Sequence, residues 1–72
     1  MVNANLLKSK IVLHGETMAT LADYLGISRQ TLTLKMSGAN DFTQSEIKQI
    51  ILKYDLTLEE TNAIFFGESN ES

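Results

Sequence analysis

The chain has 72 residues with no proline, cysteine or tryptophan, and six basic against nine acidic residues give it a formal net charge of −3. A chain this short forms one small domain without room for a deep catalytic cleft, and the absence of cysteine excludes disulfide bonds and cysteine zinc sites. No apolar run approaches the roughly 20 residues that span a bilayer, so no membrane partner is expected, and the sequence pI of about 4.9 argues against bulk coating of nucleic acid.

Glycine residues divide the chain into segments with the apolar spacing of helices. The first predicted helix covers about 4–14, where Leu7 and Ile11 lie one turn apart on one face. Gly15 ends it, because glycine enters the left-handed region without a Cβ penalty. The second predicted helix covers about 17–25 and begins at a threonine that can cap its first turn.

A third predicted helix runs from 29 to 36 or 37, after the N-cap candidate Ser28. Two Thr-x-x-Glu capping boxes, at 43–46 and 57–60, open the fourth and fifth predicted helices, which extend to about 53 and 66. No segment alternates with the period of a strand over more than a few residues. The predicted fold is therefore all-α, a small five-helix domain over residues 1–67 followed by a frayed polar tail at 68–72.

The connection between the second and third helices predicts a helix-turn-helix. Such a unit needs a small residue where the two backbones approach, which Ala22 supplies, and a residue with positive φ in the turn, which Gly26 supplies. It also needs an apolar plug after the turn, here Ile27. Further apolar residues seal both helices, namely Leu21, Leu25 and Leu32. All of these features in register indicate a helix-turn-helix.

Residues 21–32, followed by Gly38, residues 42–43 and residues 46–47, resemble the helix-turn-helix family of phage repressors and Cro proteins, the xenobiotic-response-element-type transcriptional regulators. The resemblance extends over about 7–66. It implies a lambda-repressor-like fold, binding to double-stranded operator DNA and a role in a phage genetic switch. It also implies a cytoplasmic location in a bacterial host cell.

Helical geometry and the resemblance together indicate which side chains face DNA. With Leu32 taken as the buried direction, steps of about 100° per residue place Met36 beside it. The opposite face and the first turn hold the base-contact candidates, which are Arg29, Gln30, Thr33, Leu34 and Ser37. Arginine can pair with guanine, and glutamine with adenine, through two hydrogen bonds each. In the family that the chain resembles, such positions contact bases.

The resemblance also implies phosphate contacts from the start of the second helix and from the loop after the third. The matching residues are Thr17, Met18, Lys35, Asn40, Thr43 and Gln44. Two departures from the family lower the expected DNA affinity: methionine stands at 18 where glutamine is frequent, and Asp41 brings a negative charge into the phosphate-facing loop. Leu34 stands where the family usually has a polar or basic residue. It either contacts a thymine methyl group or indicates that this chain binds DNA more weakly.

A further departure concerns the core. Several family members pair an arginine of the first helix with a glutamate at the end of the third, where this chain has Ile11 and Met36. We expect a hydrophobic contact to replace that ion pair without weakening the fold.

Catalysis is not expected. His14 is the only histidine, and it cannot supply both partners that Ser28 would need in a catalytic triad. No set of side chains provides partners for His14 as a metal ligand, so neither a metal nor a cofactor is predicted.

Ile64, Phe65 and Phe66 form an apolar run at the end of the last predicted helix. One helix cannot turn three consecutive side chains inward, so part of the run is expected on the surface, where apolar side chains usually mark an interface. These three residues and Leu34 are the protein-interface candidates.

Two functions fit these patterns. The first is a sequence-specific DNA-binding regulator, expected as a homodimer on a pseudo-palindromic operator. The second is an antirepressor or modulator that uses the same fold to bind a cognate repressor protein and binds DNA only weakly. Four basic and two acidic residues give 1–37 a net charge of +2, whereas two basic and seven acidic residues give 38–72 a net charge of −5. The low pI is therefore compatible with DNA binding, but few phosphates can be neutralised.

Overall fold

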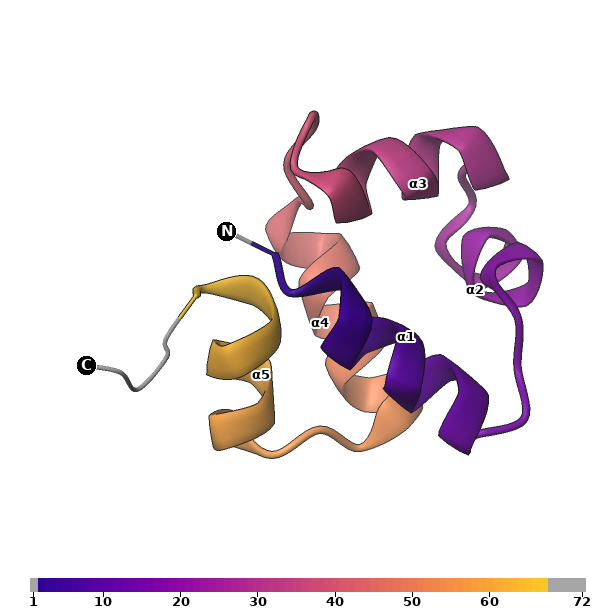
Figure 1. Cartoon of the computed structure of the whole chain (residues 1–72). Coiled ribbons are helices and arrows are strands. Elements are labelled where there is room, and N and C mark those ends of the chain that lie inside the picture. The colour runs from indigo at the N-terminus through magenta and orange to yellow at the C-terminus, as the bar shows by residue number, and fades with distance from the viewer. Residues whose placement is uncertain (1, 68–72) are drawn as a thin grey trace.

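The computed structural model describes residues 2–67, and Figure 1 shows its helices. They are α1 (Ala4–Leu13), α2 (Met18–Leu25), α3 (Arg29–Ser37), α4 (Gln44–Tyr54) and α5 (Leu58–Phe65). No strand occurs in this part of the chain, and the predicted all-α fold of five helices is confirmed. The tail predicted for 68–72 lies outside the described residues. Within 2–67, no helix has the length and hydropathy needed to cross a bilayer.

Each helix begins with a side chain that accepts a hydrogen bond from the backbone amide three residues further on. The capping residues are Asn3, Thr17, Ser28, Thr43 and Thr57. The two predicted capping boxes, at 43–46 and 57–60, are confirmed, because each glutamate also accepts from the backbone amide of its threonine. A third box opens α2, where Thr20 takes the place of the glutamate.

The turn between α2 and α3 depends on Gly26, whose φ of 76° lies in the left-handed region. The amide of Gly26 donates to the carbonyl of Asp23, and the amide of Ile27 donates to the carbonyl of Ala22, so the chain leaves α2 through a tight turn. The end of α4 is different. There Asp55 adopts a φ of 51° and is the only non-glycine residue within 2–67 with a positive φ.

The core contains five fully buried large side chains, one from each helix: Leu7, Leu21, Leu32, Ile50 and Ile64. Ile11 and Met36 belong to the same buried cluster, so both positions of the expected hydrophobic replacement lie in the core. Phe65 packs edge-on against Phe42, with 5.4 Å between the ring centroids. The core thus ties the helix-turn-helix to α1, α4 and α5.

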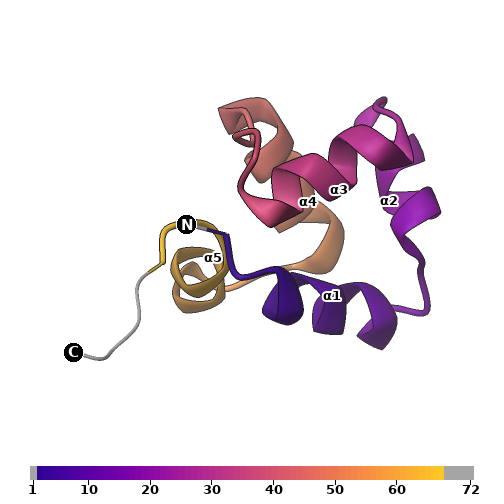
Figure 2. The ribbon, with the colours of Figure 1, turned by 45° about the horizontal axis from the view of Figure 1, so that its top comes forward.

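The helices leave α3 at one edge of the molecule. α1 and α5 lie side by side, and the amide of Asn3 donates to the carbonyl of Ile64 at 2.7 Å, which holds the start of the chain beside α5 (Figure 2). No other helix covers the outer side of α3 in either view (Figures 1 and 2). The packing therefore presents one complete side of α3 to solvent.

A polar cluster holds the loop between α1 and α2 against α4. Glu16 accepts hydrogen bonds from Lys53 Nζ at 2.9 Å and from the hydroxyl of Tyr54 at 3.0 Å. Lys53 Nζ also lies 4.3 Å from the centroid of the Tyr24 ring. Burial raises the pKa of Tyr54 above its ordinary range, and the hydrogen bond to Glu16 raises it further. The phenol consequently stays protonated and continues to donate to Glu16.

We predict that Gly26→Ala destabilises the domain by about 1 kcal/mol, because an L-residue is strained at positive φ. No atom lies within 4 Å of an added Cβ at this position, so the effect comes from the backbone alone. In thermal unfolding, a loss of this size lowers the Tm by about 4–8 °C for a domain of this length. Gly26→Asn is the matched control and loses less stability, since asparagine tolerates the left-handed region. Equal Tm values for all three proteins would contradict this account of the turn.

Candidate nucleic-acid interface

The outer side of α3 carries the five base-contact candidates, and the structure exposes all of them: Arg29, Gln30, Thr33, Leu34 and Ser37. The opposite side is buried, with Leu32 at 0% and Met36 at 3% exposure. The predicted orientation of the helix is therefore confirmed. Contact of these side chains with DNA stays a prediction.

The exposed side chains of α3 differ in how free their polar groups are. The hydroxyl of Thr33 donates to the carbonyl of Arg29, and the hydroxyl of Ser37 donates to the carbonyl of Leu34. Among the described residues, the side chains of Arg29 and Gln30 make no hydrogen bond or ion pair. These two side chains are thus the polar groups of α3 best able to reach a base edge.

Four phosphate candidates are exposed: Thr17, Thr43 and Gln44 at the starts of α2 and α4, and Asn40 in the loop after α3. The hydroxyl oxygens of both threonines accept from backbone amides of their own helices, as capping residues do. Met18 is half-buried and packs against the core. Any contact of Met18 with phosphate therefore depends on its backbone amide, at the positive end of the α2 dipole.

Lys35 is placed differently from the expectation. Its ammonium group lies 2.8 Å from Glu46 Oε1 and donates to the carbonyl of Asp41 at 3.1 Å, and its side chain is only 11% exposed. This ion pair joins the end of α3 to the start of α4. The structure argues against Lys35 as a phosphate contact, because contact would require breaking a largely buried ion pair.

The apolar run at the end of α5 is divided between the core and the surface. Ile64 and Phe65 are 0% and 7% exposed, whereas Phe66 is 54% exposed. The expectation that part of the run lies on the surface is confirmed by Phe66. The expectation that Ile64 and Phe65 take part in an interface is not met, because their side chains pack inside the domain. Phe66 lines a shallow groove with Ile47 and Ile51 of α4.

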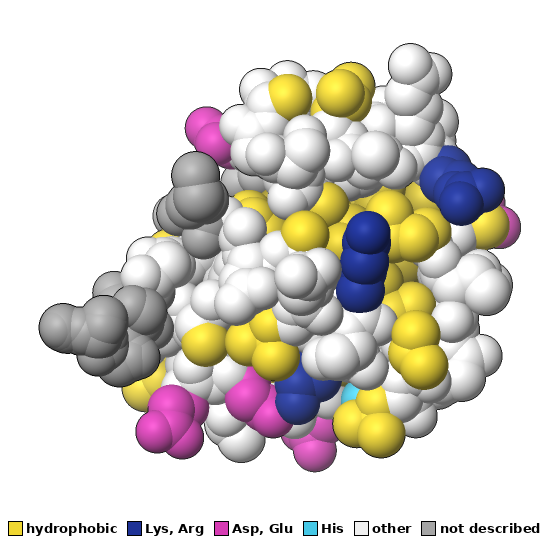
Figure 3. Space-filling model, in the orientation of Figure 1, with side chains coloured by type: hydrophobic (Ala, Val, Ile, Leu, Met, Phe, Trp, Pro, Cys, Tyr) yellow, Lys and Arg dark blue, Asp and Glu magenta, His cyan; other side chains and the backbone are white. Residues whose placement is uncertain are grey.

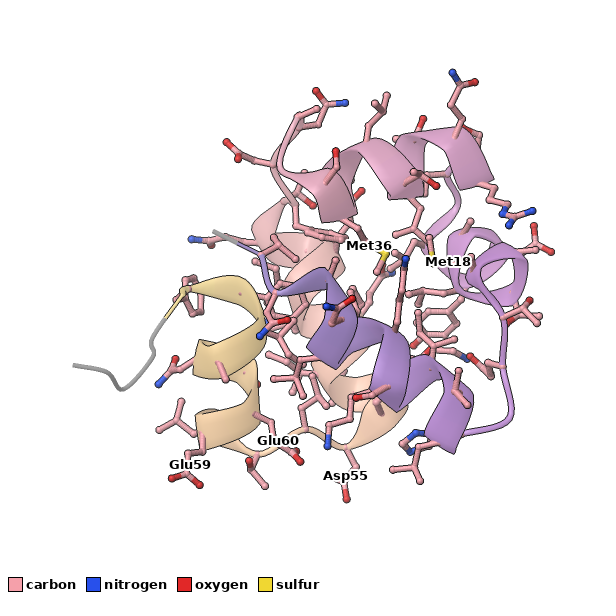
Figure 4. The ribbon with its side chains drawn as sticks, in the orientation of Figure 1. Met18, Met36, Asp55, Glu59 and Glu60 are labelled. Atoms are coloured by element: carbon pink, nitrogen blue, oxygen red, sulfur yellow. The ribbon has the colours of Figure 1, made fainter. Side chains whose placement is uncertain are left out.

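A second groove lies between α1 and α3, and sequence reasoning missed it. Apolar side chains reach it from Met18 and Met36 (Figure 4), and Lys8 and Arg29 line the same groove. Figure 3 shows hydrophobic surface between α1 and α3, with basic side chains on it and beside it. No sequence spacing connects residue 8 with residue 29. Only the packing of α1 beside α2 and α3 brings these two cations to one groove.

Part of the acidic charge of the domain lies far from α3. Asp55, Glu59 and Glu60 are at the end opposite α3 (Figure 4). Within 2–67, Lys10 pairs with Glu60 and Lys35 with Glu46, whereas Lys8 and Arg29 form no ion pair. The cations of the N-terminal half that remain available to an anionic partner are therefore Lys8 and Arg29.

Comparison with known proteins found no matching family model, no matching curated protein and no matching solved structure.

The Glu46 carboxylate makes stability depend on pH. Burial raises the pKa of Glu46, but the hydrogen bonds from Lys35 and from the amide of Thr43 outweigh burial and hold the pKa below its ordinary value of 4.5. A carboxyl group whose pKa is lower in the folded state stabilises the fold above its unfolded pKa. That stabilisation is lost as the pH falls below about 4.5 and through the folded pKa.

We predict that Glu46→Gln reduces the free energy of unfolding near pH 7 by about 1 kcal/mol or more, because it leaves Lys35 without its anion. The variant also loses less stability than the wild type when the pH is lowered below about 4.5, since its side chain cannot be protonated. Urea unfolding at a series of pH values measures both effects. Glu59→Gln is the control, because it removes an exposed carboxylate that forms no ion pair within 2–67. Its free energy of unfolding is expected to depend on pH as that of the wild type does. Parallel pH profiles for wild type and Glu46→Gln would refute the assignment.

Proposed function

We propose that the protein is a small transcriptional regulator of the phage repressor and Cro type that binds operator DNA through α3. The observation that carries this proposal is the uncovered side of α3, on which Arg29 and Gln30 have no intramolecular partner among the described residues. The buried side of the same helix fixes its orientation through Leu32 and Met36. A helix held in this way can enter the major groove while its support remains on the domain.

The relation of α3 to α2 supports the proposal. α2 is capped by the left-handed glycine Gly26, and α3 begins three residues later at Arg29, after the capping residue Ser28. A recognition helix presents its first turn to the base edges, and that turn contains Arg29 and Gln30. Arginine reads guanine and glutamine reads adenine in the major groove, each through two hydrogen bonds. The two side chains together would therefore specify a short base sequence.

Few cations are available for phosphate contacts. Lys10 and Lys35 are engaged in ion pairs with Glu60 and Glu46, and non-specific DNA affinity depends on the number of phosphates that a protein neutralises. The proposal therefore implies weak non-specific binding and a shallow dependence of affinity on salt. Discrimination among DNA sequences then rests mainly on base contacts.

A homodimer is the form in which such a small domain gains enough contacts for an operator. Two copies would place their recognition helices about 34 Å apart, one turn of DNA. The exposed ring of Phe66, beside Ile47 and Ile51 in one groove, provides an apolar surface for self-association. We place the proposed dimer contact at this surface, on α4 and α5.

Leu34 favours a second candidate function. It is 40% exposed on the outer side of α3, and an apolar side chain there suits a protein groove as well as a thymine methyl group. In this alternative, the domain modulates a cognate repressor by binding it through α3. Binding to that repressor without selection of any DNA sequence would favour this alternative over the first.

We predict that the protein selects a preferred sequence from a library of random duplexes and that Arg29→Ala with Gln30→Ala weakens binding to the selected duplex about 30-fold or more. Each bidentate base contact contributes roughly 1–3 kcal/mol of discrimination. Fluorescence anisotropy at fixed salt measures both affinities. Glu59→Ala, at the end of the domain opposite α3, serves as the control and changes affinity by less than about threefold, because an exposed charge at that distance is screened by salt. The proposal would be overturned if no sequence were selected, or if the double variant and the control lost the same affinity for the selected duplex.

We predict that Phe66→Asp shifts the protein toward the monomer and weakens operator binding while leaving the fold intact. The side chain is more than half exposed, so its replacement removes little core packing, and a carboxylate opposes burial of the apolar surface. Sedimentation equilibrium gives the dimer dissociation constant, and circular dichroism checks the helices. Leu58→Asp makes the same change at another exposed apolar site, at the start of α5, and is expected to leave association unchanged. Equal association of wild type and Phe66→Asp would place the dimer contact elsewhere.

A further inference from the structure

The groove between α1 and α3 has an apolar floor and a defined size. Met18 and Met36 line it together with Ala4, and its volume is about 240 Å³. Small-molecule sites occupy about 300–1,000 Å³, so this groove is small for a cofactor or metabolite. Its size suits a single large apolar side chain. Methionine is flexible and polarizable and accommodates apolar partners of different shapes.

The rim of the groove is cationic. Lys8 on α1 and Arg29 on α3 are exposed and line the groove, and no Asp or Glu is among its lining residues. Neither cation forms an ion pair within the part of the chain that the structure describes. An apolar floor between two uncompensated cations is complementary to an apolar side chain with carboxylates on either side.

The floor distinguishes this groove from a simple phosphate site. A DNA backbone brings anionic oxygens that need hydrogen-bond donors, and methionine side chains have none. The hydroxyl of Thr33, which also lines the groove, already donates to the carbonyl of Arg29. Burying the floor against DNA phosphates would gain little, whereas burying it against an apolar side chain is favourable in proportion to the area removed from water.

We propose that this groove binds an acidic segment of a partner protein, which inserts one apolar side chain between Lys8 and Arg29. The segment and DNA would exclude each other, because Arg29 and Thr33 line the groove and also belong to the outer side of α3. The competition rests on the proposed DNA-binding function. Binding of the acidic segment to the groove does not depend on that function.

The first test uses defined peptides and the full chain without DNA. The probe is a short, fluorescein-labelled, amidated peptide with one central leucine between glutamates, and fluorescence anisotropy measures its dissociation constant. Replacing the leucine by alanine is expected to weaken binding about tenfold, because it removes apolar area from the contact. Replacing the glutamates by glutamines is expected to weaken binding by a similar factor and to abolish most of its salt dependence. Equal binding of all three peptides, or no binding of the leucine–glutamate peptide at millimolar protein, would overturn the proposal.

The second test uses surface variants whose fold is checked by thermal unfolding. Lys8→Glu converts an attraction into a repulsion and is expected to weaken peptide binding about tenfold. Lys48→Glu makes the same change on α4, away from the groove, and is expected to change binding by less than about twofold. Met18→Gln removes apolar area from the floor of the groove, so it is expected to weaken binding of the leucine–glutamate peptide. Equal effects of the two charge reversals would refute the site.

Competition separates this inference from the proposed function. Unlabelled leucine–glutamate peptide is expected to displace the selected DNA duplex, and the alanine peptide to displace it about tenfold less effectively. Peptide binding by a protein that selects no DNA sequence would support the groove and overturn the DNA-binding function. If Lys8→Glu weakens DNA binding but leaves peptide binding unchanged, Lys8 contacts phosphate and the groove does not bind the acidic segment.

Discussion

The whole structure depends on the packing of five aliphatic side chains, one from each helix, into a single core. The helices have only 8 to 11 residues, and helices shorter than about 12–15 residues are marginal in water on their own. Each fully buried leucine or isoleucine contributes roughly 1.5–3 kcal/mol. The capping residues fix where the helices begin, and packing in the core stabilises them. Because Leu32 holds α3 from its inner side, the outer side is free to carry polar residues.

Local patterns predicted the features that local physics controls. The Thr43 and Thr57 boxes marked two helix starts, Gly26 marked the turn, and apolar spacing gave the buried side of α3. The errors lie where residues far apart in the sequence meet. Lys35 was expected to face phosphate, but Glu46, on the next helix, holds it inward. Phe65 was expected at an interface, but the ring of Phe42 helps to bury it. No spacing rule encodes either contact.

The polar contacts of the domain lie around the apolar core and join separate elements. Ile11 and Met36 are both buried in the core, where an arginine and a glutamate would have to be desolvated. The ion pairs lie around this core instead and join separate elements: Lys35 joins α3 to α4, and Lys53 joins α4 to the loop after α1. The Lys35–Glu46 pair is largely buried, and hydrogen bonds to the carbonyl of Asp41 and from the amide of Thr43 help to offset its desolvation. The result is an apolar centre below α3 and a small number of unpaired cations beside it.

Under the two proposals, the same arrangement would link DNA binding to protein binding. Two of the four basic residues in 1–37 cross-link helices, and the other two, Lys8 and Arg29, flank one groove. Each phosphate that a protein neutralises adds to its DNA affinity through counterion release, so a domain with only two free cations beside the helix proposed to bind DNA would have little electrostatic affinity to lose. An acidic ligand that engaged both cations would remove the attraction at this helix and would also cover Arg29. Under the two proposals, a partner of modest affinity would be sufficient to release the domain from DNA, because few free cations lie beside α3.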